Sequence, residues 1–206
     1  MTQTNLTRPQ GLTRIDPVLR EAAIELGVVE FRAETLAAER ERANLVAARR
    51  AAAVETNAVA VESRSIPGPD GQPLDLRLYR GLAESPLPLV VYAHAGGFVT
   101  GNLDTDHAHC AELARDASCL VVSVDYRLAP ENPCPAALDD MEAAFRYAVE
   151  NSIDLSTDAS RIAVMGRNAG AALVAGLTQR MFDAEGPTIL VQILHQPMLD
   201  SDTTPS

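Results

Sequence analysis

The most chemically suggestive stretch of the chain is the pentapeptide at residues 166–170, which reads Gly-Arg-Asn-Ala-Gly. Its two glycines have the spacing of the pattern G-x-S-x-G, in which a serine on a sharp turn between a strand and a helix acts as a nucleophile. Asn168 stands at the serine position. A primary amide has no proton that a base removes near neutral pH, and its oxygen is a poor nucleophile. Asn168 is therefore predicted to occupy the nucleophile position without forming a covalent intermediate.

A second glycine-containing segment lies upstream, where the apolar residues 89–92 lead into the sequence H-A-G-G-F at residues 94–98. Glycine allows the backbone to approach a substrate carbonyl with its N–H groups turned inward, so that they stabilise a developing oxyanion. A lone Gly-Gly pair is more often a plain turn. Its position before the pentapeptide favours a binding loop, with the N–H groups of Gly96, Gly97 and Ala169 as donors and His94 at the start of the loop.

Two further motifs lie between these segments, after an apolar strand predicted at residues 121–124. They are D-Y-R-L-A-P-E at residues 125–131 and P-A-A-L-D-D at residues 135–140. Taken in chain order, the four motifs resemble the hormone-sensitive-lipase-like family of α/β-hydrolase carboxylesterases, over roughly residues 76–199. The resemblance implies hydrolysis of short to medium acyl esters by Ser, Asp and His in that order, without a cofactor or a metal. It also implies an α/β fold with a mostly parallel, doubly wound sheet, helices on both faces and an N-terminal helical cap.

The sequence departs from this family at three points. Asn168 replaces the serine, Ala95 replaces the first glycine of the loop, and the sequence stops at Ser206 after the expected sixth strand. The family's acid and then its histidine follow on later strands, whereas after Asn168 this sequence has a single histidine, His195, and no histidine follows Asp200 or Asp202. We therefore expect a C-terminally truncated, catalytically impaired member whose last strands and triad acid and base are missing.

Three functional interpretations follow from these residues. The first is a carboxylic ester hydrolase by descent that has lost its activity. The second is a non-catalytic binding protein that keeps a pocket for a small ester or acyl ligand, whose carbonyl or carboxylate the loop N–H groups hold. The third is a fragment without a function of its own, and the sequence leaves all three open.

Composition narrows the class of protein further. The 206 residues are 47% hydrophobic, which is enough for one sizeable core, and the formal net charge of −11 argues against nucleic acid or an anionic membrane as partner. No apolar run has the length of a membrane span, and residues 1–10 are too polar for a signal peptide, so a cytoplasmic location is expected. The three cysteines have no metal-like spacing and are predicted to be reduced and mostly buried.

Apolar periodicity divides the chain into a helical segment at residues 1–55 and a truncated hydrolase core at residues 56–206. Helices predicted at 16–26 and 33–53 either form a lid over the acyl pocket, as the resemblance implies, or merely pack on the sheet edge. In the core, alternation predicts a hairpin of strands 59–65 and 74–79, and further apolar patterns predict helices at about 106–117, 135–151 and 169–183. A last strand at residues 189–194 would leave an apolar sheet edge open to self-association.

Several charged residues receive structural rather than chemical roles. His107 and His109 are two positions apart and would diverge on a helix, so the D-T-D-H-A-H run at residues 104–109 is a poor metal site. Asp104 or Asp106 is predicted to be the N-cap of the following helix. The charged pair in the 125–131 motif, Arg127 and Glu131, is predicted to form a structural clasp. Arg167, beside Asn168, is predicted to be solvated or to tune the local electrostatics.

Overall fold

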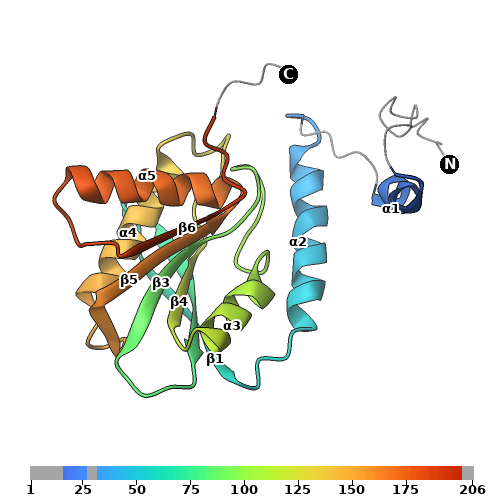
Figure 1. Ribbon diagram of the computed structural model, residues 1–206. Coiled ribbons are helices and arrows are strands. Elements are labelled where there is room, and N and C mark those ends of the chain that lie inside the picture. The colour runs from blue at the N-terminus through green and yellow to red at the C-terminus, as the bar shows by residue number, and fades with distance from the viewer. Residues whose placement is uncertain (1–15, 27–31, 201–206) are drawn as a thin grey trace. The chain divides into compact units, whose positions relative to one another are not determined.

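The computed structural model describes residues 16–26 and 32–200 of the chain (Figure 1). The chain forms two compact units, Met1–Glu39 and Arg40–Ser206. Helix α1 (Pro17–Leu26) lies in the first unit, and helix α2 (Leu36–Ala52) begins there and continues into the second. Both helices were predicted within a few residues of their bounds. The division at residue 55 and the role of this segment as a lid stay predictions.

The second unit contains a six-stranded sheet in the order β1-β2-β4-β3-β5-β6. The two hairpin strands are antiparallel to each other, and β2 is antiparallel to β4, whereas β4, β3, β5 and β6 run parallel. The strands are β1 (Val59–Pro67), β2 (Pro73–Gly81), β3 (Leu87–Ala93), β4 (Leu120–Val124), β5 (Thr157–Arg167) and β6 (Val191–His195). The predicted mostly parallel sheet is therefore confirmed.

Two layers of helices cover the sheet, one on each face (Figure 1). Helices α4 (Ala136–Glu150) and α5 (Ala169–Asp183) pack together on one face, and α3 (His107–Asp116) packs on the other. The central strands β3 and β4 are almost wholly buried, as parallel strands between two helical layers should be. Val91 and Val122 face the core under α4 and α5, while their neighbours Val90 and Val121 face the core under α3. Strand alternation thus divides one apolar run between two cores.

Strand β6 is the last strand of the sheet, as expected for residues 189–194. Among the described residues it pairs only with β5, which leaves its other backbone edge open. Val191 is 50% exposed and Ile193 is 38% exposed. This edge carries exposed apolar side chains and no carboxylate, lysine or arginine, unlike the other terminal strand β1, which carries Glu62 and Arg64.

The structure also bears on two predictions that came from composition. All three cysteines are free; Cys110 and Cys119 are buried, whereas Cys134 is exposed. Burial raises the pKa of the Cys119 thiol to about 11, so this thiol stays protonated. No helix in the described part of the chain combines the length and the apolar character needed to cross a membrane.

The two glycines of helix α5 lie in different surroundings, and this difference is testable. A Cβ at Gly170 would lie 2.2 Å from the carbonyl oxygen of Ala93, whereas a Cβ at Gly176 would meet only side-chain carbons of Leu138 at 3.3 and 3.4 Å. We expect Gly170→Ala to lower the free energy of unfolding by about 1–3 kcal/mol or more, because backbone must move. Gly176→Ala should be neutral or stabilising by up to about 1 kcal/mol, because alanine favours helix.

Chemical denaturation of the two variants beside the wild-type chain measures this difference. Equal unfolding free energies for the two alanine variants would show that helix α5 does not approach β3 as closely as described.

Candidate active site

Asn168 lies on a sharp turn between β5, which ends at Arg167, and α5, which begins at Ala169. Its backbone has φ 53° and ψ −118°, a conformation that costs a residue with a side chain on the order of 1–3 kcal/mol. Two hydrogen bonds hold it there: the Asn168 N–H donates to the carbonyl of His195 at 2.9 Å, and the Asn168 carbonyl accepts from the N–H of Ala171 at 3.1 Å. The predicted turn at Asn168 is confirmed.

Steric crowding explains the two glycines of this turn. A Cβ at Gly166 would lie 2.3 Å from the carbonyl oxygen of Gly170. A Cβ at Gly170 would lie 2.5 Å from the carbonyl oxygen of His94 in addition to its clash with Ala93. The first turn of α5 therefore rests against the end of β3, where the upstream glycine loop begins. This contact brings the two segments singled out in the sequence together.

The glycine loop after β3 is a closed turn. The carbonyl of Gly96 accepts hydrogen bonds from the N–H groups of Val99 and Thr100, at 3.2 and 2.9 Å, and from the Thr100 hydroxyl at 2.9 Å. Gly96 and Gly97 have φ values of 150° and 60°, the region that glycine adopts without strain. With the Gly96 carbonyl fixed inside the loop, the chain beyond it turns toward the elbow.

One N–H of this loop meets the elbow directly. The N–H of Gly97 donates to the side-chain oxygen Oδ1 of Asn168 at 3.1 Å. The predicted donor and the residue at the nucleophile position are therefore in contact, and the asparagine amide occupies the acceptor position of that donor. Ala169 is buried next to them as the first residue of α5. The donor roles of Gly96 and Ala169 stay predictions.

His94 supports the loop from within the protein. Its side chain is fully buried and stacks on the ring of Tyr126, with ring centroids 4.2 Å apart. Its Nδ1 lies 2.9 Å from the carbonyl oxygen of Ala95, and the Tyr126 hydroxyl donates to the His94 carbonyl at 2.7 Å. Burial lowers the pKa of His94, so the imidazole is neutral. The neutral ring donates through Nδ1 and holds the loop backbone in place.

Asp106 is the residue that sequence reasoning missed at this site. It stands at the N-cap position of α3 as predicted, but its side chain makes no capping hydrogen bond. Instead Oδ2 accepts from the Ala95 N–H at 3.0 Å, and Oδ1 pairs with Nη1 of Arg167 at 2.6 Å. The Arg167 side chain is 35% exposed but is bound by a nearly buried carboxylate, so it is not simply solvated, and its influence on the local electrostatics stays a prediction. The position of an Asp shortly after a glycine loop could have indicated a role at the site, but the predicted N-cap role already accounted for this residue.

The charged pair of the 125–131 motif is also paired differently from the prediction. Arg127 binds the buried carboxylate of Asp140 at 2.9 Å and Asp70 at 2.7 Å. Glu131 instead accepts from Arg40 of helix α2, at 2.7 and 2.8 Å. Both residues are structural, as expected, but they do not bind each other.

Arg40 connects helix α2 to the glycine loop. Its guanidinium also donates to the carbonyls of Val99 and Ala129, each at 2.5 Å. The Arg40 side chain is 21% exposed, so these bonds are partly shielded from water. Val99 is the residue whose N–H closes the loop onto Gly96. The helix that the sequence assigned to the cap segment is therefore bonded to the loop.

The remaining histidines do not complete a base at the elbow. His107 contacts the hydroxyl of Tyr79 at 2.9 Å, and the ring of His109 lies 5.7 Å from that of Tyr92. The side chain of His195 is exposed at the end of β6. Among the side chains of residues 16–21 and 32–200, no histidine is hydrogen-bonded to a carboxylate, and no three His, Cys, Asp or Glu side chains are grouped so that they could hold a metal.

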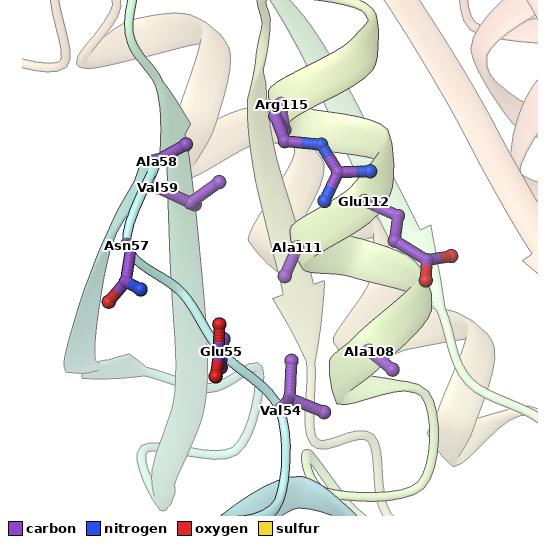
Figure 2. A pocket seen from close by; sticks show the side chains of 9 residues that line it. All are labelled: Val54, Glu55, Asn57, Ala58, Val59, Ala108, Ala111, Glu112 and Arg115. Atoms are coloured by element: carbon purple, nitrogen blue, oxygen red, sulfur yellow. The ribbon is translucent and has the colours of Figure 1, made fainter.

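A groove of about 430 Å³ lies elsewhere, between helix α3 and the segment that leads into β1 (Figure 2). Its walls include Val54 and Val59 on one side and Ala111 and Arg115 on the other. None of its lining residues belongs to the elbow or to the glycine loop. The groove is therefore separate from the contact between Gly97 and Asn168.

Comparisons with known proteins agree with this geometry. A model of the alpha/beta hydrolase fold family matches residues 90–206. Carboxylesterase NlhH of Mycobacterium tuberculosis is 37% identical over 204 residues, which cover 98% of this chain and 61% of that protein. Esterase LipI of the same organism is 44% identical over 136 residues, covering 65% of this chain and 42% of that protein.

A solved structure, esterase LipW from Mycobacterium marinum, superposes with a TM-score of 0.85 at 48% identity. The match covers 95% of this chain and 62% of that one. The chain thus spans about two fifths to three fifths of the length of the curated relatives described here. By its matched residues and its fold, the chain belongs to the alpha/beta hydrolase fold family, in the hormone-sensitive-lipase-like branch of carboxylesterases.

Proposed function

We propose that this chain is a carboxylesterase-type α/β-hydrolase that does not hydrolyse esters by the covalent route of its family. The observation that supports this proposal is the position of Asn168, which has the strained backbone of a nucleophile on an elbow but carries an amide. Acyl transfer at an elbow requires a hydroxyl or thiol whose proton a base removes. The Asn168 amide provides neither, and its Oδ1 accepts a hydrogen bond from Gly97.

Loss of the nucleophile is a large effect. In a serine protease, removal of the nucleophilic serine lowers kcat by about a million-fold, and only the oxyanion-binding and substrate-binding effects remain. The same loss would leave this site with its loop N–H groups and no covalent chemistry. A relative that is named a carboxylesterase supports a carboxylic ester as the ligand class.

Restoring the hydroxyl alone should not restore activity. We expect Asn168→Ser to hydrolyse p-nitrophenyl butyrate no faster than the wild-type chain. In the part of the chain that the structure describes, no histidine is hydrogen-bonded to a carboxylate, so the serine hydroxyl has no oriented general base. General-base catalysis contributes about 10²–10⁴-fold in rate. Initial rates followed at 400 nm measure the difference.

A graft is the matched control for this variant. The remaining C-terminal part of a full-length relative, fused to this chain with Asn168 and separately with Asn168→Ser, tests whether the serine acts once a base is supplied. Only the grafted chain with Asn168→Ser should hydrolyse p-nitrophenyl butyrate at an enzyme-like rate. An enzyme-like rate for the ungrafted Asn168→Ser chain would mean that a base is already present and that this part of the proposal is wrong.

A second function, non-covalent binding of a carboxylate, is favoured by the contact between Gly97 and Asn168. The Gly97 N–H donates a hydrogen bond to the side-chain oxygen of Asn168 on the elbow. In the absence of that side chain, the oxygen of an ester carbonyl or a carboxylate would accept this hydrogen bond. The Asn168 amide therefore competes with a ligand for this donor. A carboxylate binds at this donor only when its hydrogen bonds contribute more free energy than the bond between Gly97 and Asn168 that it displaces.

Removal of the competing amide should strengthen binding. We expect Asn168→Ala to bind butyrate about 2- to 10-fold more tightly than the wild-type chain, because one hydrogen bond is worth about 0.5–1.5 kcal/mol. Calorimetric titration with sodium butyrate measures both affinities, and sodium chloride at equal ionic strength is the control. Weaker binding by Asn168→Ala than by the wild-type chain would contradict this competition.

We also propose that the open edge of β6 mediates self-association of this chain. Its support is the combination of a backbone edge without a partner strand among the described residues and the exposed apolar side chains of Val191 and Ile193. Such an edge is a template for another strand unless charge or cover protects it. The β6 sequence V-Q-I-L-H carries no carboxylate and no arginine.

Substitutions at the two ends of the sheet test this self-association. We expect Ile193→Lys to shift the chain toward monomer in sedimentation velocity, because a charge blocks the pairing of two such edges. Val61→Lys is the matched control, since Val61 is 40% exposed on the opposite terminal strand β1 and Ile193 is 38% exposed on β6. A wild-type chain that stays monomeric at high concentration would rule the edge interaction out.

A further inference from the structure

The carboxylate of Asp106 is buried beneath the glycine loop and accepts hydrogen bonds from three different segments. Its side chain is 3% exposed. Oδ2 accepts from the Tyr92 hydroxyl on β3 at 3.1 Å and from the Ala95 N–H at 3.0 Å. Oδ1 accepts from Nη1 of Arg167, the last residue of β5, at 2.6 Å. One carboxylate thus connects the strand before the loop, the loop itself and the residue before Asn168.

Helix α3 fixes the position of this carboxylate. The Asp106 carbonyl accepts a hydrogen bond from the N–H of Cys110 at 2.9 Å, and this bond closes the first turn of α3. Cys110, Ala111 and Ala114 of that helix are buried against the sheet. Helix α3 therefore holds the carboxylate in a fixed place, and the carboxylate in turn positions the loop and the elbow.

We propose that Asp106 is the positioning residue that holds the Gly97 N–H and the elbow in register for an oxyanion or carboxylate ligand. Ala95 lies two residues before Gly97, and Arg167 lies directly before Asn168. Both sides of the contact between Gly97 and Asn168 are thus tied to the same carboxylate. This role rests on the proposed function, because the ligand it serves is the one proposed there.

The three donors need a side chain with two oxygens that both accept hydrogen bonds. A carboxylate has two oxygens that only accept, whereas an asparagine amide has one acceptor oxygen and an NH₂ group that only donates. In Asp106→Asn, an NH₂ group must face either Arg167 or the pair formed by Tyr92 and Ala95. One side of the network is then lost although the side chain keeps its size.

Amide hydrogen exchange measured by NMR reads the position of the loop directly. In Asp106→Asn we expect the Gly97 amide to exchange about tenfold faster or more, relative to the strand amides of Val91 and Val122 in the same sample, since its hydrogen bond to Asn168 is weakened. Gly97 does not bond to Asp106, so a change there reports displacement of the loop. Unchanged relative exchange at Gly97 would overturn the proposal.

Two tyrosines on the α3 face of the sheet provide a matched pair that keeps the buried charge. Tyr92 and Tyr79 are both fully buried, and their hydroxyls contact neighbouring residues, Asp106 for Tyr92 and His107 for Tyr79. We expect Tyr92→Phe to speed hydrogen exchange at the Gly97 amide and Tyr79→Phe to leave it unchanged. The two variants should lower the melting temperature by comparable amounts. Equal effects of the two variants would mean that Gly97 exchange reports only general stability, and the proposal would fail. This pair decides the question if Asp106→Asn does not fold.

Butyrate titration separates this proposal from the function on which it rests. In the Asn168→Ala background, adding Asp106→Asn should weaken butyrate binding by about tenfold. Should Asn168→Ala bind no butyrate while Gly97 exchange still responds to Asp106→Asn, the binding function is wrong and the positioning role stands. Equal butyrate affinity with and without Asp106→Asn would contradict the positioning role.

Discussion

The close approach of helix α5 to the end of β3 is the constraint on which the rest of the site depends. Without side chains at Gly166 and Gly170, the first turn of the helix rests on the carbonyls of Ala93 and His94. This contact forces the strained backbone of Asn168 and places its side chain against the N–H of Gly97. The backbone strain is offset by the packing of α5 over the sheet, where Val174 and Leu177 are fully buried.

Burial determines which of the charged pairs matter to the site. Arg115 and Asp116 form an ion pair on the surface, with side chains 48% and 66% exposed, and such solvent-screened pairs contribute little to stability. Asp106 is 3% exposed, so removal of its partner Arg167 would leave a buried charge without its cation. The exposure of the Arg40 side chain is intermediate, and it binds both the carboxylate of Glu131 and the backbone carbonyls of Val99 and Ala129. A buried charge thus lies directly beneath the loop and the elbow.

Local patterns in the sequence predicted the elements and the elbow, because apolar periodicity and glycine spacing act over a few residues. The network around Asp106 could not be predicted in this way, since its partners Tyr92 and Arg167 lie 14 and 61 positions away in the chain. Glu131 shows the same limit: its partner is Arg40, 91 positions away, rather than the nearby Arg127. Long-range pairing depends on strand order, which the sequence specified only through its resemblance to a family.

The proposed function requires that an ester which reaches this site forms no covalent bond with Asn168. Intact-protein mass spectrometry of the wild-type chain after exposure to p-nitrophenyl butyrate, followed by peptide mapping of the segment from β5 to α5, tests it most directly. We expect this segment to remain unmodified while p-nitrophenol is released at the uncatalysed rate. A stoichiometric butyryl group on that segment, with release of p-nitrophenol in a burst, would contradict it.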